Sequence, residues 1–373
     1  MSQLDWVEKL KGSLPKFLNK LKVVPDQPGR FLPCSEGFTG EGKQIALGFS
    51  CFALKIYYTL GLWEGIPAQE RKDWIEFLKS FQLDNKPTDV KETYNAFIDK
   101  PVIAYLKRQM PWYKRFTGHV FRSHQLTHLQ ETIIAETKQA VATLAQVGES
   151  ADRPYRGFHK TKKKVENYLS RLDWREPWGA GAQVAALAVF LKTQAPRIMR
   201  QEEIQLLLDT CICFIESLTK KEHGAYFLGI TPEHGVLING AMKVLTALDW
   251  LEVPIHYPEK LIDTCLKRLP SSDGCHLVDA IYVIYRCLQQ TQYKKKEVKA
   301  YCKQLLNMIA QHHNPDGGFS YHIGRGQRYY YSVPISRGLT ESDIHGTCLL
   351  TWAIAMIFEI MNENTLGWRV IRP

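Results

Sequence analysis

The sequence lacks the long hydrophobic runs that membrane proteins carry. No stretch of about 18 or more consecutive apolar residues occurs in its 373 residues, so no membrane-spanning helix is expected. Residues 1–22 (MSQLDWVEKLKGSLPKFLNKLK) lack the apolar core and the small-residue cleavage site of a secretory signal peptide. These absences predict a cytoplasmic protein.

A disulfide framework is also missing. The chain has nine cysteines, an odd number, and several of them lie inside apolar segments with helical spacing: Cys51, Cys211, Cys213, Cys287 and Cys348. Such positions are typical of reduced thiols in a hydrophobic core, and reduced thiols fit a cytosolic compartment.

Signatures of nucleic-acid binding are absent, although the formal net charge is +10. No zinc-finger, RNA-recognition or helix-turn-helix pattern accompanies the basic residues. The basic runs at 160–164 and 293–296 begin outward-facing helices and are typical of a solvated face. The charge therefore favours an anionic small molecule, and it leaves peripheral contact with an acidic membrane open. It does not indicate the oligomeric state.

Strand patterns and long Pro/Gly/Ser-rich linkers are absent as well, and helical segments of two kinds alternate along the chain. One kind is apolar and rich in small residues: 43–61, 129–148, 179–193, 235–251, 275–290 and 346–361. The other kind is amphipathic: 4–21, 68–81, 160–172, 202–218, 257–269 and 295–311. Because a helix that is apolar all round is buried and an amphipathic one lies at the surface, the alternation predicts an all-α (α/α)6 toroid. We expect one domain over 1–373, with an extra helix at 88–108.

The first amphipathic segment, 4–21, has a second interpretation. It mixes apolar and lysine side chains and could lie on a membrane surface. The repeat count needs it as the first outer helix, which we favour.

The connections that lead into the apolar helices are the unusual ones. They contain most of the histidines, many aromatics and the Gly pairs, at 31–42, 112–128, 173–181, 222–235, 270–276 and 314–346. In a toroid these connections meet at one rim, where the N-termini of the inner helices direct free N–H groups toward an anion. We therefore expect the functional site at this rim.

Two segments carry a resemblance to a known family. SDGCHLVDAIYVIY (272–285) and DIHGTCLLTWAIAM (343–356) resemble the Asp-x-Cys and Asp-x-x-His helices of protein prenyltransferases, within the terpenoid-cyclase superfamily. The resemblance implies zinc ligands at Asp273, Cys275 and His345, and an enzyme that acts on a prenyl diphosphate or a polyene. EHGVLINGAMKVLTAL (233–248) is similar to a third helix of that family, which implies His234 near the diphosphate.

The resemblance has departures, and its residues have simpler interpretations. The loop at 270–273 is short, the residue after His345 is Gly346 instead of Thr, and no class II Asp-x-Asp-Asp motif occurs. Asp273 and Asp343 could be helix N-caps, and Cys275 could be a small core residue. Glu341 and Asp343 nevertheless stand at the mouth of an apolar helix, where we take them with Asp273, His345 and His234 as candidate catalytic residues.

A second cluster needs no metal. It comprises Arg122, His124, His128, Glu131, Tyr226, Glu233, His234, Arg325, Arg328 and Tyr329–Tyr331. Such groups suit an anionic sugar, so the alternative function is a carbohydrate-active toroid, a lyase or hydrolase on an acidic glycan. A third hypothesis is a non-catalytic toroid that binds a peptide or protein. The candidate substrate-binding residues are Trp178, His124, His128, Tyr226, Phe319, Tyr321, Arg325, Arg328 and Tyr330.

Overall fold

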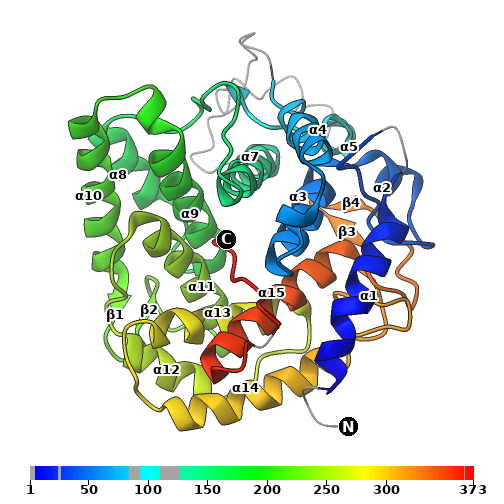
Figure 1. Ribbon diagram of the computed structural model, residues 1–373. Coiled ribbons are helices and arrows are strands. Elements are labelled where there is room, and N and C mark those ends of the chain that lie inside the picture. The colour runs from blue at the N-terminus through cyan, green and yellow to red at the C-terminus, as the bar shows by residue number, and fades with distance from the viewer. Residues whose placement is uncertain (1–4, 24–26, 84–92, 110–126, 365) are drawn as a thin grey trace.

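The computed structural model describes residues 5–23, 27–83, 93–109, 127–364 and 366–373. Helices dominate these residues and lie in an inner and an outer ring (Figure 1). The inner helices are α3 (Leu47–Thr59), α7 (His128–Gln146), α9 (Pro177–Thr193), α11 (His234–Leu251), α13 (Gly274–Leu288) and α15 (Ile344–Met361). The outer helices are α1 (Asp5–Leu21), α4 (Ala68–Lys79), α8 (Lys162–Arg171), α10 (Gln201–Leu218), α12 (Pro258–Leu266) and α14 (Lys295–Ala310).

The inner helices close into a ring. Each packs against the next inner helix along the chain, and α15 packs back against α3. The outer helices cover them from outside: α10 contacts α9 and α11, and α14 contacts α13 and α15. The protein is therefore an all-α (α/α)6 toroid, as the alternation of helix types predicts.

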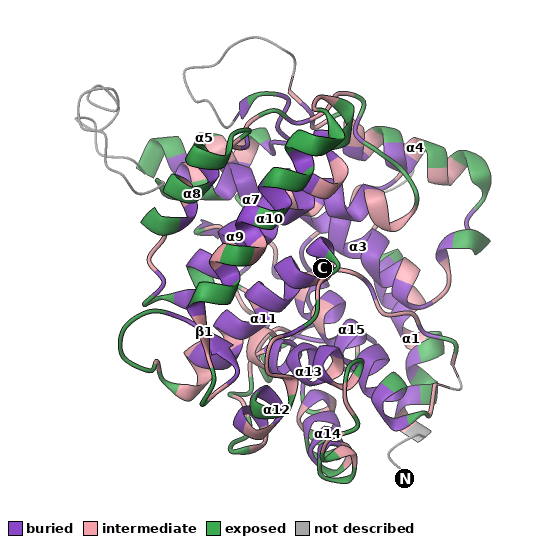
Figure 2. Cartoon of the chain, turned by 90° about the vertical axis from the view of Figure 1, so that its left-hand side faces the viewer, coloured by how far each residue is buried: buried purple, intermediate pink, exposed green. Residues whose placement is uncertain are grey.

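Burial separates the two rings (Figure 2). Helix α15 buries every residue except His345, Leu349 and Glu359. By length and composition it is the one helix in the described part of the chain that could cross a membrane, yet 83% of it is buried inside the fold. Its apolar character thus follows from its place in the inner ring. Helix α1 buries one stripe, which includes Leu14 and Phe17, and takes the outer position expected for 4–21.

Small residues let α9 and α11 approach closely. A Cβ atom at Gly240 would lie 2.7 Å from the Cβ of Pro177, and one at Gly181 would lie 2.7 Å from the Cβ of Lys243. No side chain fits at these distances, so the two glycines set the spacing of the helices.

The extra helix is shorter than the expected 88–108. Helix α5 spans Lys100–Gln109, and residues 84–92 lie outside the described residues. Residues 96–99 are not helical, and Phe97 forms a β-bridge with Gln82. Pro101 is the reason for the late start, because proline is tolerated in the first turn of a helix but not in its interior.

The remaining elements are small. Within the described residues they are the helix α2 (Gly40–Gln44), two turns of 3-10 helix (Trp63–Gly65 and Ala195–Arg197), and the antiparallel pairs β1 (Thr219–Lys220) with β2 (Ala225–Tyr226) and β3 (Tyr329–Tyr330) with β4 (Val333–Pro334). Both pairs lie in or beside connections that lead into inner helices.

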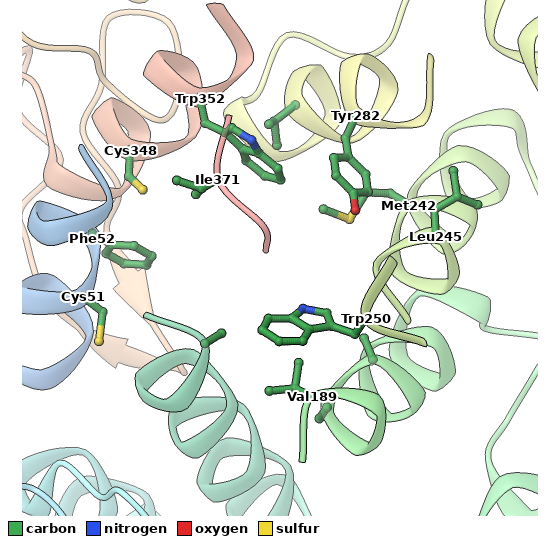
Figure 3. Close-up of a cluster of buried hydrophobic side chains, with 14 of the residues drawn as sticks. Cys51, Phe52, Val189, Met242, Leu245, Trp250, Tyr282, Cys348, Trp352 and Ile371 are labelled. Atoms are coloured by element: carbon green, nitrogen blue, oxygen red, sulfur yellow. The ribbon is translucent and has the colours of Figure 1, made fainter. Parts of the chain in front are cut away.

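The C-terminal segment 366–373 enters the ring at the end where the inner helices finish (Figures 1 and 2). The indole N–H of Trp250 donates to the carbonyl of Pro373 at 2.8 Å, and the N–H of Arg369 donates to the carbonyl of Thr59 at 2.8 Å. Apolar side chains from α3, α9, α11, α13 and α15 gather beside it with Ile371 (Figure 3). This end of the toroid is filled, so a site of substrate size belongs at the opposite rim.

Candidate functional site

Asp343 holds the long connection before α15. Its carboxylate caps the helix, accepting from the N–H of Gly346 at 2.7 Å, and it also accepts from the N–H groups of Tyr321 at 2.7 Å and Gln327 at 3.0 Å. Burial raises the pKa of Asp343 to about 6, although these hydrogen bonds lower it. Backbone N–H groups donate to both carboxylate oxygens. Asp343 therefore has the N-cap role that the sequence left open.

Glu341 ties the same connection to the N-terminal part of the chain. Its carboxylate accepts from the hydroxyl of Ser35 at 3.1 Å and from the N–H groups of Glu36 at 2.8 Å and Gly37 at 2.7 Å. The side chain is buried. Glu341 therefore links the connection 31–42 to the connection 314–346. Both of its oxygens accept hydrogen bonds from the protein.

A carboxylate–imidazole pair stands at the start of α13. Asp273 caps the helix by accepting from the N–H of His276, and its other oxygen lies 2.5 Å from the Nδ1 of His276 and 3.0 Å from the Ser271 hydroxyl. The Nε2 atom of the same ring faces Gly235 of α11. A Cβ atom added at Gly235 would lie 3.9 Å from this Nε2. Asp273 thus orients the imidazole and leaves Nε2 for another partner.

A pocket of about 670 Å³ opens beside this pair, between the starts of α11 and α13 and the end of α12. It is lined by His223, Thr231, Pro232, Glu233, His234, Gly235, Leu237, Thr264, Lys267, Arg268, Leu269, Pro270, Ser271 and His276, and we call it the rim pocket. Lys267 and Arg268 are exposed, and within the described part of the chain neither forms an ion pair with a carboxylate. The pocket therefore presents two cations and three imidazoles.

His234 has a defined tautomer in this pocket. Its Nε2 lies 2.8 Å from the carbonyl oxygen of Thr264, which can only accept a hydrogen bond. Nε2 therefore carries the hydrogen, and in the neutral ring Nδ1 is an acceptor. This histidine is at the rim where the sequence placed it.

His345 lies nearer the axis of the toroid. Its ring stacks on Phe52, with centroids 4.4 Å apart, and on Tyr321 at 5.5 Å. Its Nδ1 lies 2.9 Å from the Oε1 of Gln327, which fixes Nδ1 as a donor. The ring therefore stacks on two aromatic side chains, and Nε2 is left as the acceptor.

The expected zinc ligands do not form a metal-binding group. Within the residues that the structure describes, no three His, Cys, Asp or Glu side chains are arranged to hold a metal ion, and this includes Asp273, Cys275 and His345. Asp273 is bound to His276, and burial raises the pKa of the Cys275 thiol to about 12. Although neighbouring inner helices bring the three residues to one rim, each side chain has protein partners of another kind.

Comparison with known proteins gives matches only among solved structures. No family model matches the chain, and no curated protein matches it. A polysaccharide lyase is 10% identical, with 99% of this chain and 100% of that chain covered and a TM-score of 0.44. A possible member of glycoside hydrolase family 105 from Salmonella enterica serovar Paratyphi A is 12% identical, with 95% and 94% covered and a TM-score of 0.39. A glycosyl hydrolase family 88 protein from Bacteroides vulgatus is 12% identical, with 97% and 99% covered and a TM-score of 0.33.

These matches correct the family that the sequence suggested. The matched proteins are polysaccharide lyase and glycosyl hydrolase toroids, so the resemblance to terpenoid cyclases and prenyltransferases is wrong, and with it the isoprenoid function. The physical reason is that small-residue inner helices with capping Asp residues arise in any (α/α)6 ring, because tight packing and helix N-termini impose them. Identities of 10–12% leave the likeness at the level of the fold.

The candidate aromatic residues divide between rim and core. Trp178 is 50% exposed at the start of α9, and Tyr321 is half-buried against His345. Tyr226, Phe319 and Tyr330 are instead buried, with exposures of 1%, 0% and 5%. The structure therefore corrects the placement of these three, which are buried against other parts of the chain: Tyr330 packs on Phe52 of α3, and Phe319 on Trp6 of α1.

The candidate basic residues that the structure describes lie on the rim. Arg325 and Arg328 are exposed, and the guanidinium of Arg328 lies over the ring of Tyr329. The Nε2 of His128, the first residue of α7, lies 3.2 Å from the Ser332 hydroxyl. Arg122 and His124 lie outside the described residues.

Sequence reasoning missed four charged residues in the inner helices. Lys55, Lys138, Lys243 and Asp279 lie in the middle of α3, α7, α11 and α13. It also treated His276 only as a neighbour of Cys275. The available signal was a charged residue in the middle of each largely apolar segment, because a buried helix carries a charge in its interior only where another group needs it.

Proposed function

We propose that this protein is a carbohydrate-active enzyme of the lyase type, which cleaves an acidic glycan at the rim pocket. The observation that carries the proposal is the oriented Asp273–His276 pair beside Lys267 and Arg268 in a pocket of about 670 Å³. Pockets of this size suit one or two sugar rings. Nine of the 14 lining residues have polar or charged side chains, which can bind sugar hydroxyls.

The chemistry follows from the two kinds of group. Lys267 and Arg268 can neutralise the carboxylate of a uronic acid, which makes the proton on the adjacent carbon more acidic. The Nε2 of His276 then takes that proton, while Asp273 stabilises the imidazolium through Nδ1. The electrons of the C–H bond form a C=C bond and the bond to the neighbouring sugar's oxygen breaks. That oxygen takes up a proton from water, and the His276 imidazolium returns the proton it removed to solvent. A shortened glycan and an unsaturated uronic acid result.

Elimination fits the pocket better than hydrolysis does. Glycoside hydrolysis uses two carboxyl groups that face the same bond. In the rim pocket Glu233 is the one carboxylate among the described lining residues, and Asp273 is occupied by His276 and Ser271. A single oriented histidine with two cations is the set that an elimination needs.

The test is an assay on uronate-containing and neutral polysaccharides, which follows the ultraviolet absorbance of the unsaturated product. We expect turnover of a uronate-containing glycan, a loss of about 100-fold or more in kcat for His276→Gln, and a smaller loss for Asp273→Asn. Asparagine caps a helix as well as aspartate does, so Asp273→Asn removes the charge and keeps the cap.

The control is Lys296→Gln, at an exposed position of α14 away from the rim pocket, which should keep full activity. Binding of the glycan without any cleavage would favour the non-catalytic toroid. Equal cleavage by His276→Gln, or cleavage of neutral glycans alone, would contradict the proposal.

A further inference from the structure

Two arginines of the connection before α15 lie side by side on the rim, and the lyase mechanism uses neither of them. Both Arg325 and Arg328 are exposed, and neither lines the rim pocket. We propose that they form a second anion-binding site, the arginine pair, which binds a further acidic sugar of the glycan whose cleavage site is in the rim pocket. The identity of this ligand rests on the proposed function. The substrate is then a chain that carries more than one acidic sugar.

Gly338 brings the two side chains together. A Cβ atom at Gly338 would lie 2.8 Å from the Cγ of Arg328 and 3.3 Å from the Cγ of Arg325, so both stems lie against the backbone of this glycine. The φ angle of Gly338 is +72°, a conformation that other residues rarely adopt. The two guanidinium groups therefore extend from neighbouring stems.

Backbone hydrogen bonds hold the segment that leads to the pair. The buried carboxylate of Asp343 accepts from the N–H groups at both ends of the segment 321–327, at 2.7 and 3.0 Å. Within this segment the N–H of Arg325 donates to the carbonyl of His322 at 3.1 Å, and the N–H of His322 donates back at 3.2 Å. Because the backbone is already ordered, mainly the arginine side chains lose freedom when a ligand binds.

The positive charge of the pair is available to a ligand. In the part of the chain that the structure describes, neither guanidinium forms an ion pair with a carboxylate. The acids that follow in the same connection, Glu341 and Asp343, are buried and accept from backbone N–H groups. Arginine binds a carboxylate through two parallel hydrogen bonds. Two arginines held beside each other therefore suit the carboxylate of a uronic acid.

The surface beside the pair suits the sugar ring that carries such a carboxylate. The side chain of Tyr329 is 53% exposed, and the guanidinium of Arg328 lies 5.6 Å from the centroid of its ring. An aromatic face can contact the C–H groups of a sugar while the guanidinium meets the carboxylate. A free inorganic anion would use the arginines alone, so the exposed tyrosine favours an acidic sugar.

A contact with α13 places the pair on the same side of the rim as the catalytic residues. The N–H of Gly274, the first residue of α13, donates to the carbonyl of Tyr321 at 2.9 Å. Gly274 follows Asp273, which orients His276, and Tyr321 begins the segment that leads to the pair. A glycan with one acidic sugar in the rim pocket can therefore reach the arginine pair with another.

The test compares a disaccharide of uronic acids with a longer oligosaccharide of the same sugar as substrates of the full chain. In Arg325→Gln/Arg328→Gln, the KM for the longer substrate should rise roughly tenfold or more at unchanged kcat, because the pair binds the ground state and the transition state alike. The KM for the disaccharide, which fills only the rim pocket, should not change. Arg325→Lys/Arg328→Lys should give an intermediate KM, since lysine keeps the charge and loses the bidentate geometry.

The matched control is Lys163→Gln/Lys164→Gln on the outer helix α8, which removes the same charge from two exposed positions. Every KM should stay unchanged in this variant. An equal rise in the control would reduce the effect to net charge and would overturn the arginine pair. An unchanged KM for the longer substrate in Arg325→Gln/Arg328→Gln, or an equal rise for the disaccharide, would also overturn it.

A binding measurement separates this inference from the lyase function. The longer oligosaccharide is titrated calorimetrically into His276→Gln with and without the two arginine substitutions, so no cleavage by the proposed base is involved. A Kd that rises roughly tenfold or more with the arginine substitutions supports the pair, even if the wild type cleaves no glycan. Equal Kd values, or no binding to His276→Gln, overturn the pair even if the wild type proves to be a lyase.

Discussion

Glu341 and Asp343 show how an acid in a buried connection can serve the backbone instead of a substrate. Each accepts hydrogen bonds from N–H groups of chain segments that would otherwise have no acceptor. A buried N–H without a partner is costly, so a short acid at a helix start satisfies several donors at once. Their presence at the mouth of α15 follows from the need to fold long connections over an apolar helix.

His345 gives a test at the scale of one residue. Burial and the charges of Lys243 and Lys55 lower its pKa from 6.5 to about 3. As pH falls below 6.5 the unfolded chain takes up a proton here and the folded protein does not, so the folded state loses stability between about pH 6.5 and pH 3. We expect the wild type to lose about 2 kcal/mol more unfolding free energy than His345→Gln when pH is lowered from 6.5 to about 5.

Urea denaturation of both proteins at the two pH values measures this difference. Asp343 and Asp279 have a raised pKa, which makes their effect run in the opposite direction, with stability lost as pH rises toward 6. Both acids are present in the wild type and in the variant, so their contributions cancel in the comparison. An equal loss of stability in the two proteins would show that His345 is protonated in the folded state.

At the scale of elements, the pairing of α9 with α11 depends on backbone-to-backbone proximity. Gly240 meets Pro177, and Gly181 meets the side-chain stem of Lys243, at separations that leave no room for a Cβ. This contact also aligns Lys243 along α9, where its amine lies over the ring of Trp178. The packing of two inner helices therefore positions the side chain of Lys243.

Gly240→Ala should destabilise the protein by about 1–3 kcal/mol, because the added methyl group must displace Pro177 or separate the helices. The matched control is Gly179→Ala on α9, where a Cβ would meet nothing within 4 Å. That change should stabilise the protein by up to about 1 kcal/mol, since alanine favours a helix. Denaturant unfolding measures both, and equal effects of the two substitutions would contradict the account of the helix contact.

At the scale of the whole molecule, the two ends of the toroid differ in kind. The end where the inner helices begin carries long connections, the rim pocket and the Asp273–His276 pair. The other end is filled by segment 366–373, where the guanidinium of Arg372 pairs with Asp249 and lies over the ring of Trp250. A ligand therefore has access from the rim, and the filled end holds the ring together.

Trp368 tests the contribution of this segment. It is 2% exposed and packs on Phe358 of α15, with ring centroids 6.0 Å apart. Trp368→Ala should lower the unfolding free energy by roughly 3–5 kcal/mol, because it leaves a large cavity. Trp178→Ala, at a 50% exposed position on the rim, should cost about 1 kcal/mol or less. Thermal and denaturant unfolding distinguish the two, and a small effect at Trp368 would mean that the segment only rests on the ring.

The sequence by itself determined the helix types, their order and the closed ring. This was possible because apolar periodicity reports burial directly, and alternating burial along a chain of helices has few packed solutions. It also determined that the connections into the inner helices meet at one rim. The helix at 88–108 was drawn too long because a proline near its start was not weighed as a boundary.

Only the tertiary structure decided which side chains meet. Asp273, Cys275 and His345 share a rim, yet Asp273 pairs with His276, which lies three residues further along the same helix start, and His345 with Gln327 from a connection. Which side chains meet depends on the rotation of the inner helices about their own axes, which is set by packing such as that at Gly181 and Gly240.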